Sequence, residues 1–201
     1  GVLLEELSAH QKAIARAAAQ AHTPRYPTPQ MVLRAYEQLR RARADADPRR
    51  LETLLLAGTL GDPDAPLSTR AATLMQTLYA GQPLGDSNAS VAVLVGLAFL
   101  QANGVAVALD GAQVADLTRA VAGQADLHLP DAPAAEPDPR DWDDIVDALV
   151  ARYREPLVRT EHVLSETQLV RLEQLPDTVR ATLQPAPGPS FEWRYLTLQD
   201  L

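Results

Sequence analysis

Apolar residues recur along most of this chain at the three- and four-residue spacing of amphipathic helices. The spacing predicts helices over about 2–21, 29–44, 48–57, 67–80, 111–123, 141–154 and 165–183. Thr28 and Asp47 are each followed by a proline, which is the pattern of an N-cap with proline at the first helical position. Clusters of turn-forming residues separate the segments, so the pattern predicts an all-α fold.

One further segment, about 87–102, is apolar on every side instead of on one face. A helix without a polar face must be buried on most sides. The segment is also shorter than the roughly 20 residues that a helix needs to span a bilayer. We therefore expect it at the centre of the core, with Leu94, Ala98 and Phe99 nearly inaccessible to solvent.

The composition along the chain divides the predicted all-α fold into four parts. They are an N-terminal helix (1–26), a helical core (27–128), a Pro-rich acidic linker (129–140) and a helical C-terminal extension with an aromatic tail (141–201). In the tail, Phe191, Trp193 and Tyr195 alternate as they would in an extended strand. They could pack on the chain's own surface or anchor a partner, and packing on the chain itself is favoured.

The overall composition excludes several kinds of function. The net charge of −8, from 26 acidic and 18 basic residues, is opposite to that of a typical phosphate-backbone binder. The chain has no cysteine, so it cannot form disulfides, thiolate metal sites or a cysteine nucleophile. It shows no secretory n-region and no apolar run of about 18 residues. We therefore expect a cytoplasmic protein that does not cross a membrane.

Two clusters of like charge could carry chemistry. Basic residues lie on one side of the predicted 29–44 helix, namely Arg34, Arg40, Arg41 and Arg43. They could bind phosphate or an acidic partner, but a solvated helix face is favoured. An acidic run comprises Asp138, Asp141, Asp143, Asp144 and Asp147. It lacks the glycine turn and terminal glutamate of a calcium loop, so an acidic first turn of a helix is favoured over a cation site.

Four segments match a known pattern in order and spacing. The stretch before the apolar helix reads Gln82, Pro83, Leu84, Gly85, Asp86, Ser87, Asn88, Ala89 and Ser90. Residues 99–105 read Phe-Leu-Gln-Ala-Asn-Gly-Val, 115–118 read Ala-Asp-Leu-Thr, and 47–52 read Asp-Pro-Arg-Arg-Leu-Glu. Together these segments resemble the Fic/Doc family, most closely its death-on-curing toxin branch, over about residues 27–126.

The resemblance implies a Fic/Doc helical core and the transfer of AMP or phosphate from a nucleotide to a protein hydroxyl. In the family signature, His-Pro-Phe-x-Asp-Gly-Asn-Lys-Arg, the histidine is the general base and the acidic residue binds magnesium. The loop amides, the helix N-terminus and the arginine hold the phosphates. Here Gln82 stands at the histidine position, and a neutral amide cannot act as a general base. Ala89 and Ser90 replace the two cations, at positions that we expect near a helix start partly open to solvent.

Asp86 and Asn88 are the retained polar residues of the signature. They could cap the apolar helix, or they could keep a residual nucleotide-binding role, with Asp86 as a magnesium ligand. Capping is favoured, because Asp, Ser and Asn are all good N-cap residues. A replacement for the lost groups could come from Arg70 or from one of four histidines, and the spacing selects none of them. The histidines are His10, His22, His128 and His162.

The function that we expect from the sequence is that of a degenerate Fic/Doc-like protein. It would lack transferase activity, need no cofactor, and act by binding a protein partner. The alternative is a divergent transferase that uses Mg-ATP and recruits its base from outside the signature. Nucleic-acid binding through the basic residues between Arg34 and Arg50 is a third possibility, which the net charge disfavours.

Overall fold

The computed structural model describes residues 24–129 and 132–173. Among these residues it has six helices and no strand, with one isolated bridge between Val105 and Ala134. The helices are α2 (Pro29–Arg40), α3 (Pro48–Thr59), α4 (Leu67–Gly81), α5 (Asn88–Ala102), α6 (Gly111–Val121) and α7 (Trp142–Glu173). The predicted all-α class is therefore confirmed. The predicted helix over 2–21, the end of the last predicted helix and the aromatic tail lie outside the described residues.

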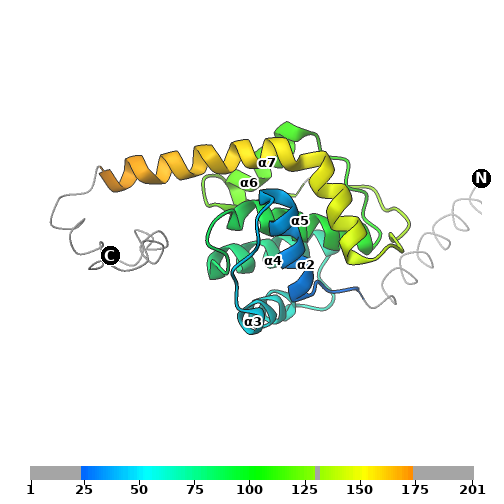
Figure 1. Cartoon of the computed structure of the whole chain (residues 1–201). Helices are drawn as coiled ribbons and strands as arrows, with labels where there is room; N and C mark the ends of the chain where they lie inside the picture. The colour runs from blue at the N-terminus through cyan, green and yellow to red at the C-terminus, as the bar shows by residue number, and fades with distance from the viewer. Residues whose placement is uncertain (1–23, 130–131, 174–201) are drawn as a thin grey trace, which may run out of the picture.

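Helix α5 forms the centre of the core, as its composition predicts. Fourteen of its fifteen residues are buried, and Leu94, Ala98 and Phe99 are at most 1% exposed. Helices α2, α4, α6 and α7 pack around it (Figure 1). A Cβ atom at Gly96 would lie 2.2 Å from Cε of Met75, so the glycine permits the close approach of α4 to α5.

The predicted N-caps are confirmed for α2 and α3. The Thr28 hydroxyl accepts a hydrogen bond from the Met31 amide at 3.3 Å, and the Asp47 carboxylate accepts one from the Arg49 amide at 3.0 Å. Helix α2 ends at Arg40, before the predicted boundary at residue 44, because Arg41 takes a left-handed conformation with φ of 54°.

The two helices predicted over 141–154 and 165–183 are wrong as separate elements. The structure has one helix of 32 residues, α7, which continues through Pro156 and changes direction along its length (Figure 1). A proline inside a helix removes one hydrogen bond and costs about 3 kcal/mol. Tyr153 and Leu157 on either side of it are at most 1% exposed, so packing against the body of the protein outweighs that cost.

The described part of the predicted linker, 132–140, lies along the C-terminal end of α5. The Ala135 amide donates to the Gly104 carbonyl at 2.9 Å, and the Asp138 amide donates to the Gln101 carbonyl at 3.1 Å. Beyond it, the first half of α7 places Ile145 and Leu157 in the same hydrophobic core as α5. The predicted core and the described part of the extension are therefore one packed unit. No helix within the described ranges has the length and apolar character that crossing a membrane would require.

Gly104 provides a test of how residues 132–140 are attached. Its φ is +87°, and an added Cβ would lie 2.9 Å from the Ala135 carbonyl oxygen. We predict that Gly104→Ala destabilises the protein by more than about 1 kcal/mol, because the left-handed conformation and the close contact both oppose a side chain. Chemical denaturation monitored by circular dichroism measures the change.

Two other glycines serve as matched controls for this substitution. Gly123 also has a positive φ, +79°, but an added Cβ would meet nothing within 4 Å, so Gly123→Ala isolates the backbone strain. Gly61 has neither constraint, and Gly61→Ala should stabilise the protein by up to about 1 kcal/mol by restricting the unfolded chain. Equal losses for Gly104→Ala and Gly123→Ala would contradict the contact with residues 132–140.

Candidate functional site

The candidate site is the loop between α4 and α5, which carries the signature-like residues. The loop leaves α4 through Gln82, with φ of 43°, and enters α5 through Ser87, with φ of 57°. Left-handed backbone at a residue with a side chain costs about 1–2 kcal/mol. Hydrogen bonds and packing in and around the loop must therefore hold the loop in this shape.

Asn88 supplies most of the hydrogen bonds within the loop. Its Oδ1 accepts from the Leu84 amide at 3.0 Å, and its Nδ2 donates to the Leu84 carbonyl at 2.9 Å and to Gln82 Oε1 at 3.1 Å. The Gln82 Nε2 in turn donates to the Tyr79 carbonyl at 2.6 Å. The amide side chains at the histidine and asparagine positions of the signature thus bind each other and the local backbone. Their role in the structure is to shape the loop.

The prediction that Asp86 and Asn88 cap α5 is wrong. Ser87 occupies the N-cap position but makes no side-chain capping bond, and Asn88 uses its side chain on the loop behind it. The capping carboxylate comes instead from α7, where Glu161 Oε1 accepts a hydrogen bond from the Ser90 amide at 2.9 Å. Glu161 could not be identified from the sequence, because 71 residues separate it from Ser90 and no local pattern marks it.

Glu161 is a largely buried carboxyl group. Burial raises its pKa above the ordinary value, and the nearby charge of Asp86 raises it further. The hydrogen bonds from Ser90 and the charge of Arg40 act in the opposite direction, but burial is the largest effect. Tyr79, at the end of α4, has a raised pKa because it is buried and because it lies near the charge of Glu161. The start of α5 is therefore an acidic and poorly hydrated environment.

Asp86 lies on the side of the loop that faces α2. Its Oδ1 lies 3.6 Å from Arg40 Nε, and this oxygen atom accepts no hydrogen bond among the described residues. Burial, followed by the charge of Asp86, raises the pKa of Tyr36 on α2. A magnesium ion at Asp86 would have to displace the guanidinium of Arg40. Nowhere in the described part of the chain do three His, Asp or Glu side chains gather as metal ligands. These residues do not fit a magnesium ion held by the protein.

The expectation that positions 89 and 90 lie partly open to solvent is wrong. Ala89 is 2% exposed and Ser90 is 0% exposed, since both belong to the buried face of α5 where it meets its neighbours. A lysine and an arginine placed there would bury two cations, and burying an unpaired charge costs several kcal/mol. The two positions belong to the core.

The structure does not bring the other candidate residues to the loop. Arg70 is twelve residues before Gln82 on α4, which corresponds to about 18 Å along the helix axis. His162 follows Glu161, but its side chain is 75% exposed and pairs with Glu166 at 3.2 Å. His128 is exposed, and His10 and His22 lie outside the described residues.

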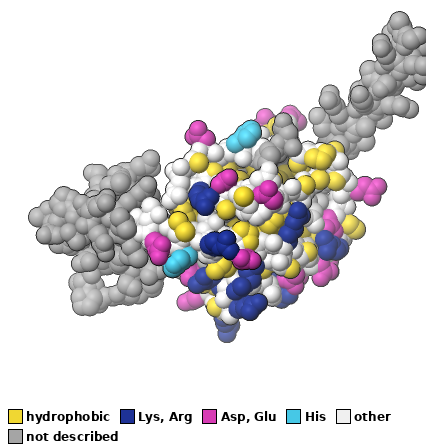
Figure 2. Space-filling view, turned by 90° about the horizontal axis from the view of Figure 1, so that it is seen from above, with side chains coloured by type: hydrophobic (Ala, Val, Ile, Leu, Met, Phe, Trp, Pro, Cys, Tyr) yellow, Lys and Arg dark blue, Asp and Glu magenta, His cyan; other side chains and the backbone are white. Residues whose placement is uncertain are grey.

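The arginines predicted to form a solvated helix face lie at the surface, and two of them form ion pairs there. Arg34 forms two hydrogen bonds to the Asp147 carboxylate of α7, at 2.7 and 2.9 Å, and they lower the pKa of Asp147. Arg40 pairs with Asp86, while Arg41 and Arg43 are exposed. On the face shown in Figure 2, acidic side chains lie among the basic ones.

Of the acidic run, Asp143 and Asp144 form the first turn of α7, as predicted.

Comparisons with protein-family models, with curated proteins and with solved structures find no match for this chain.

The raised pKa of Glu161 leads to a prediction about stability. A carboxyl whose pKa is raised by folding favours the folded state while it is protonated, and this contribution is lost as the pH rises from its ordinary value of 4.5 through the raised value. We predict that Glu161→Gln, which keeps the acceptor for the Ser90 amide, resists denaturant better than wild type at pH 7. The advantage should shrink as the pH falls toward 4.5.

Glu155→Gln is the control for this substitution. The Glu155 side chain is 82% exposed and pairs with Arg159 one helical turn away. Loss of this ion pair should lower the free energy of unfolding by at most about 0.5 kcal/mol. Denaturant unfolding at several pH values compares the two variants. A Glu161→Gln protein that is less stable than wild type at pH 7 would show that the ionised carboxylate stabilises the start of α5.

Proposed function

We propose that this chain is a degenerate Fic/Doc-like protein that lacks transferase activity and acts by binding a protein partner. The observation that carries the proposal is the hydrogen bond from the Ser90 amide to the Glu161 carboxylate. The amides at the start of a helix are a general binding site for phosphate, because their N–H groups and the helix dipole favour negative charge. In this chain a carboxylate of the protein itself occupies that position.

The charges around the loop also support the absence of nucleotide binding. Glu161 and Asp86 would both repel a phosphate at the start of α5, and Ala89 and Ser90 provide no positive charge against it. Two described cations lie beside the loop, and both have partners in the chain. Arg40 is paired with Asp86, and Arg50 donates to the Gly81 carbonyl at 2.6 Å. A nucleotide would have to displace Glu161 and leave its carboxyl group buried without the Ser90 hydrogen bond, at a cost of about 1–3 kcal/mol.

The surface offers a place for a protein partner on α3. Leu56 lies in the last turn of α3, and Leu60 is the C-cap residue that follows the helix, with its amide donating to the Leu56 carbonyl at 2.9 Å. They are 58% and 73% exposed, and with Val163 on α7 they are the large apolar side chains most exposed to solvent in the described part of the chain. We propose that this pair belongs to the contact surface.

The second candidate function is a divergent nucleotide-dependent transferase, and the position and raised pKa of Glu161 support it. A buried carboxyl with a raised pKa beside the signature loop has the properties of a general base. In that case Glu161 would accept the proton of the target hydroxyl, as the base from outside the signature.

Nucleotide binding and transfer test the first function against the second. Purified protein titrated with Mg-ATP in a calorimeter should give no binding heat, because the start of α5 is acidic and occupied. Incubation with ATP labelled at the α- or γ-phosphate should label no protein above the background of a heat-denatured sample. Labelling that is abolished by Glu161→Gln, in a folded protein, would establish the transferase and contradict the loss of activity.

The protein-binding half of the proposal needs a separate measurement. Wild-type chain should retain a partner in fixed stoichiometry from a lysate of its source, and Leu56→Asp combined with Leu60→Asp should release it. Val163→Asp is the matched control, since it adds the same charge at an exposed apolar position on another helix. Retention of the partner by the α3 variant and release by the control would place the contact elsewhere.

A further inference from the structure

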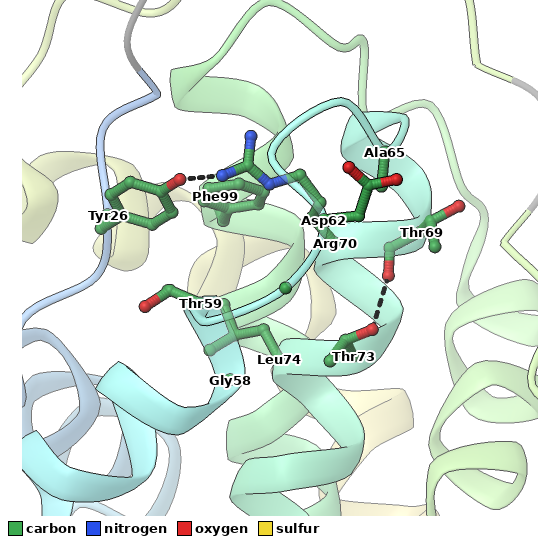
Figure 3. A pocket seen from close by; sticks show the side chains of 11 residues that line it. Tyr26, Gly58, Thr59, Asp62, Ala65, Thr69, Arg70, Thr73, Leu74 and Phe99 are labelled. Atoms are coloured by element: carbon green, nitrogen blue, oxygen red, sulfur yellow. Dashed lines mark hydrogen bonds between the residues drawn. The ribbon is translucent and has the colours of Figure 1, made fainter.

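A hollow at the other end of α4 has features of a small-molecule site. It lies between the end of α3, the start of α4 and Tyr26, and it has a volume of about 120 Å³ that is partly open to solvent (Figure 3). This volume is below the roughly 300–1,000 Å³ of sites for drug-sized ligands, so the hollow admits only a ligand with a small body. We propose that this hollow binds a small monocarboxylate whose apolar body is about the size of one ring.

The interior of the hollow is apolar and firmly packed. Leu74 and Phe99 lie beneath it, and both are 1% exposed. The ring of Tyr26 stacks on Phe99 with 5.9 Å between the ring centroids and an angle of 22° between the planes. Gly58 on α3 lies against Leu74, and an added Cβ would approach Leu74 to 3.1 Å. These contacts fix the shape of an apolar floor that suits a flat ring.

Arg70 supplies the positive charge at the mouth of the hollow. Its guanidinium lies over the Tyr26 ring, 5.3 Å from the centroid, and donates a hydrogen bond to the Tyr26 hydroxyl (Figure 3). This bond uses one of five N–H donors. No second acceptor for Arg70 is found among residues 24–129 and 132–173. A guanidinium positioned in this way, with donors to spare, matches the geometry of a carboxylate.

Two neighbouring features restrict the charge of the ligand. Helix α4 begins beside the hollow after Pro66, which provides no side-chain cap, so its first turn adds to the positive potential. Asp62 lies at the rim, where its Oδ1 accepts from the Asp64 amide at 2.9 Å. Its negative charge opposes a second negative charge on the ligand. A single carboxylate is therefore favoured over a phosphate or a dicarboxylate.

The hollow is independent of the α4–α5 loop, because Arg70 and Gln82 lie near opposite ends of α4. Binding at the hollow therefore does not depend on whether the chain is a transferase or a degenerate protein.

Benzoate is the probe for the proposed site. Titrated into ¹⁵N-labelled full-length protein, it should cause saturable shifts in the amide signals of Gly58, Gly61 and Thr69, which line the hollow. Benzamide has the same shape without the charge and should bind more weakly. Arg70→Gln should weaken benzoate binding at least about tenfold, since a hydrogen bond between charged groups is worth about 1.5–3 kcal/mol and each 1.4 kcal/mol is tenfold. The exposed Arg43→Gln is the matched control and should change nothing.

Several outcomes would overturn the proposal. They are the absence of saturable shifts with benzoate, equal affinities for benzoate and benzamide, and unchanged affinity in a folded Arg70→Gln protein. If Arg70→Gln does not fold, Ala65→Leu provides the second test, because it adds bulk to the wall of the hollow and leaves Arg70 in place. Benzoate affinity that survives Ala65→Leu would show that the ligand binds elsewhere.

Discussion

The burial of α5 on all sides is the constraint on which the rest of the structure depends. A helix in this position cannot satisfy its terminal backbone groups with water, and each unsatisfied buried group costs about 1–3 kcal/mol. At the C-terminal end, Asn103 donates to the Phe99 carbonyl at 2.7 Å and exchanges hydrogen bonds with the backbone of Arg25 at 2.7 and 3.0 Å. At the N-terminal end, Glu161 accepts from Ser90. Segments far away in the sequence are thus held at both ends of α5.

The same constraint determines what the α4–α5 loop can do chemically. Gln82 and Asn88 use their amide groups to hold the loop, and Glu161 uses its carboxylate to satisfy the helix. A nucleotide at the start of α5 would compete with these hydrogen bonds. A group that satisfies a buried backbone atom can be released only if another group replaces it. Nucleotide binding at this loop would therefore require changes in α7 as well as in the loop.

The features that the sequence could predict are those encoded locally. The apolar composition of 87–102 predicts the buried helix, and Thr28 and Asp47 predict two helix starts, because each signal and its effect lie within a few residues. Glu161 could not be found this way, since its partner is 71 residues away. The pairing of Arg34 with Asp147 across 113 residues was likewise hidden, so that helix face could only be interpreted as solvated. The two helices predicted over 141–154 and 165–183 are one helix that continues through Pro156, because tertiary packing outweighs the local cost of the proline.

The two ends of α4 differ in how freely they can change. Substitutions at the α5 end alter groups on which the burial of α5 depends, so their effects on binding and on stability cannot be separated easily. At the other end, Arg70 and the rim of the hollow lie at the surface of a floor that Leu74, Phe99 and Gly58 already fix. When surface residues lie above a rigid apolar floor, they can be substituted, and the choice of ligand can change, at little cost to the stability of the fold. Substitutions at the Arg70 end of α4 can therefore change what binds there with less effect on the fold than substitutions at the α5 end.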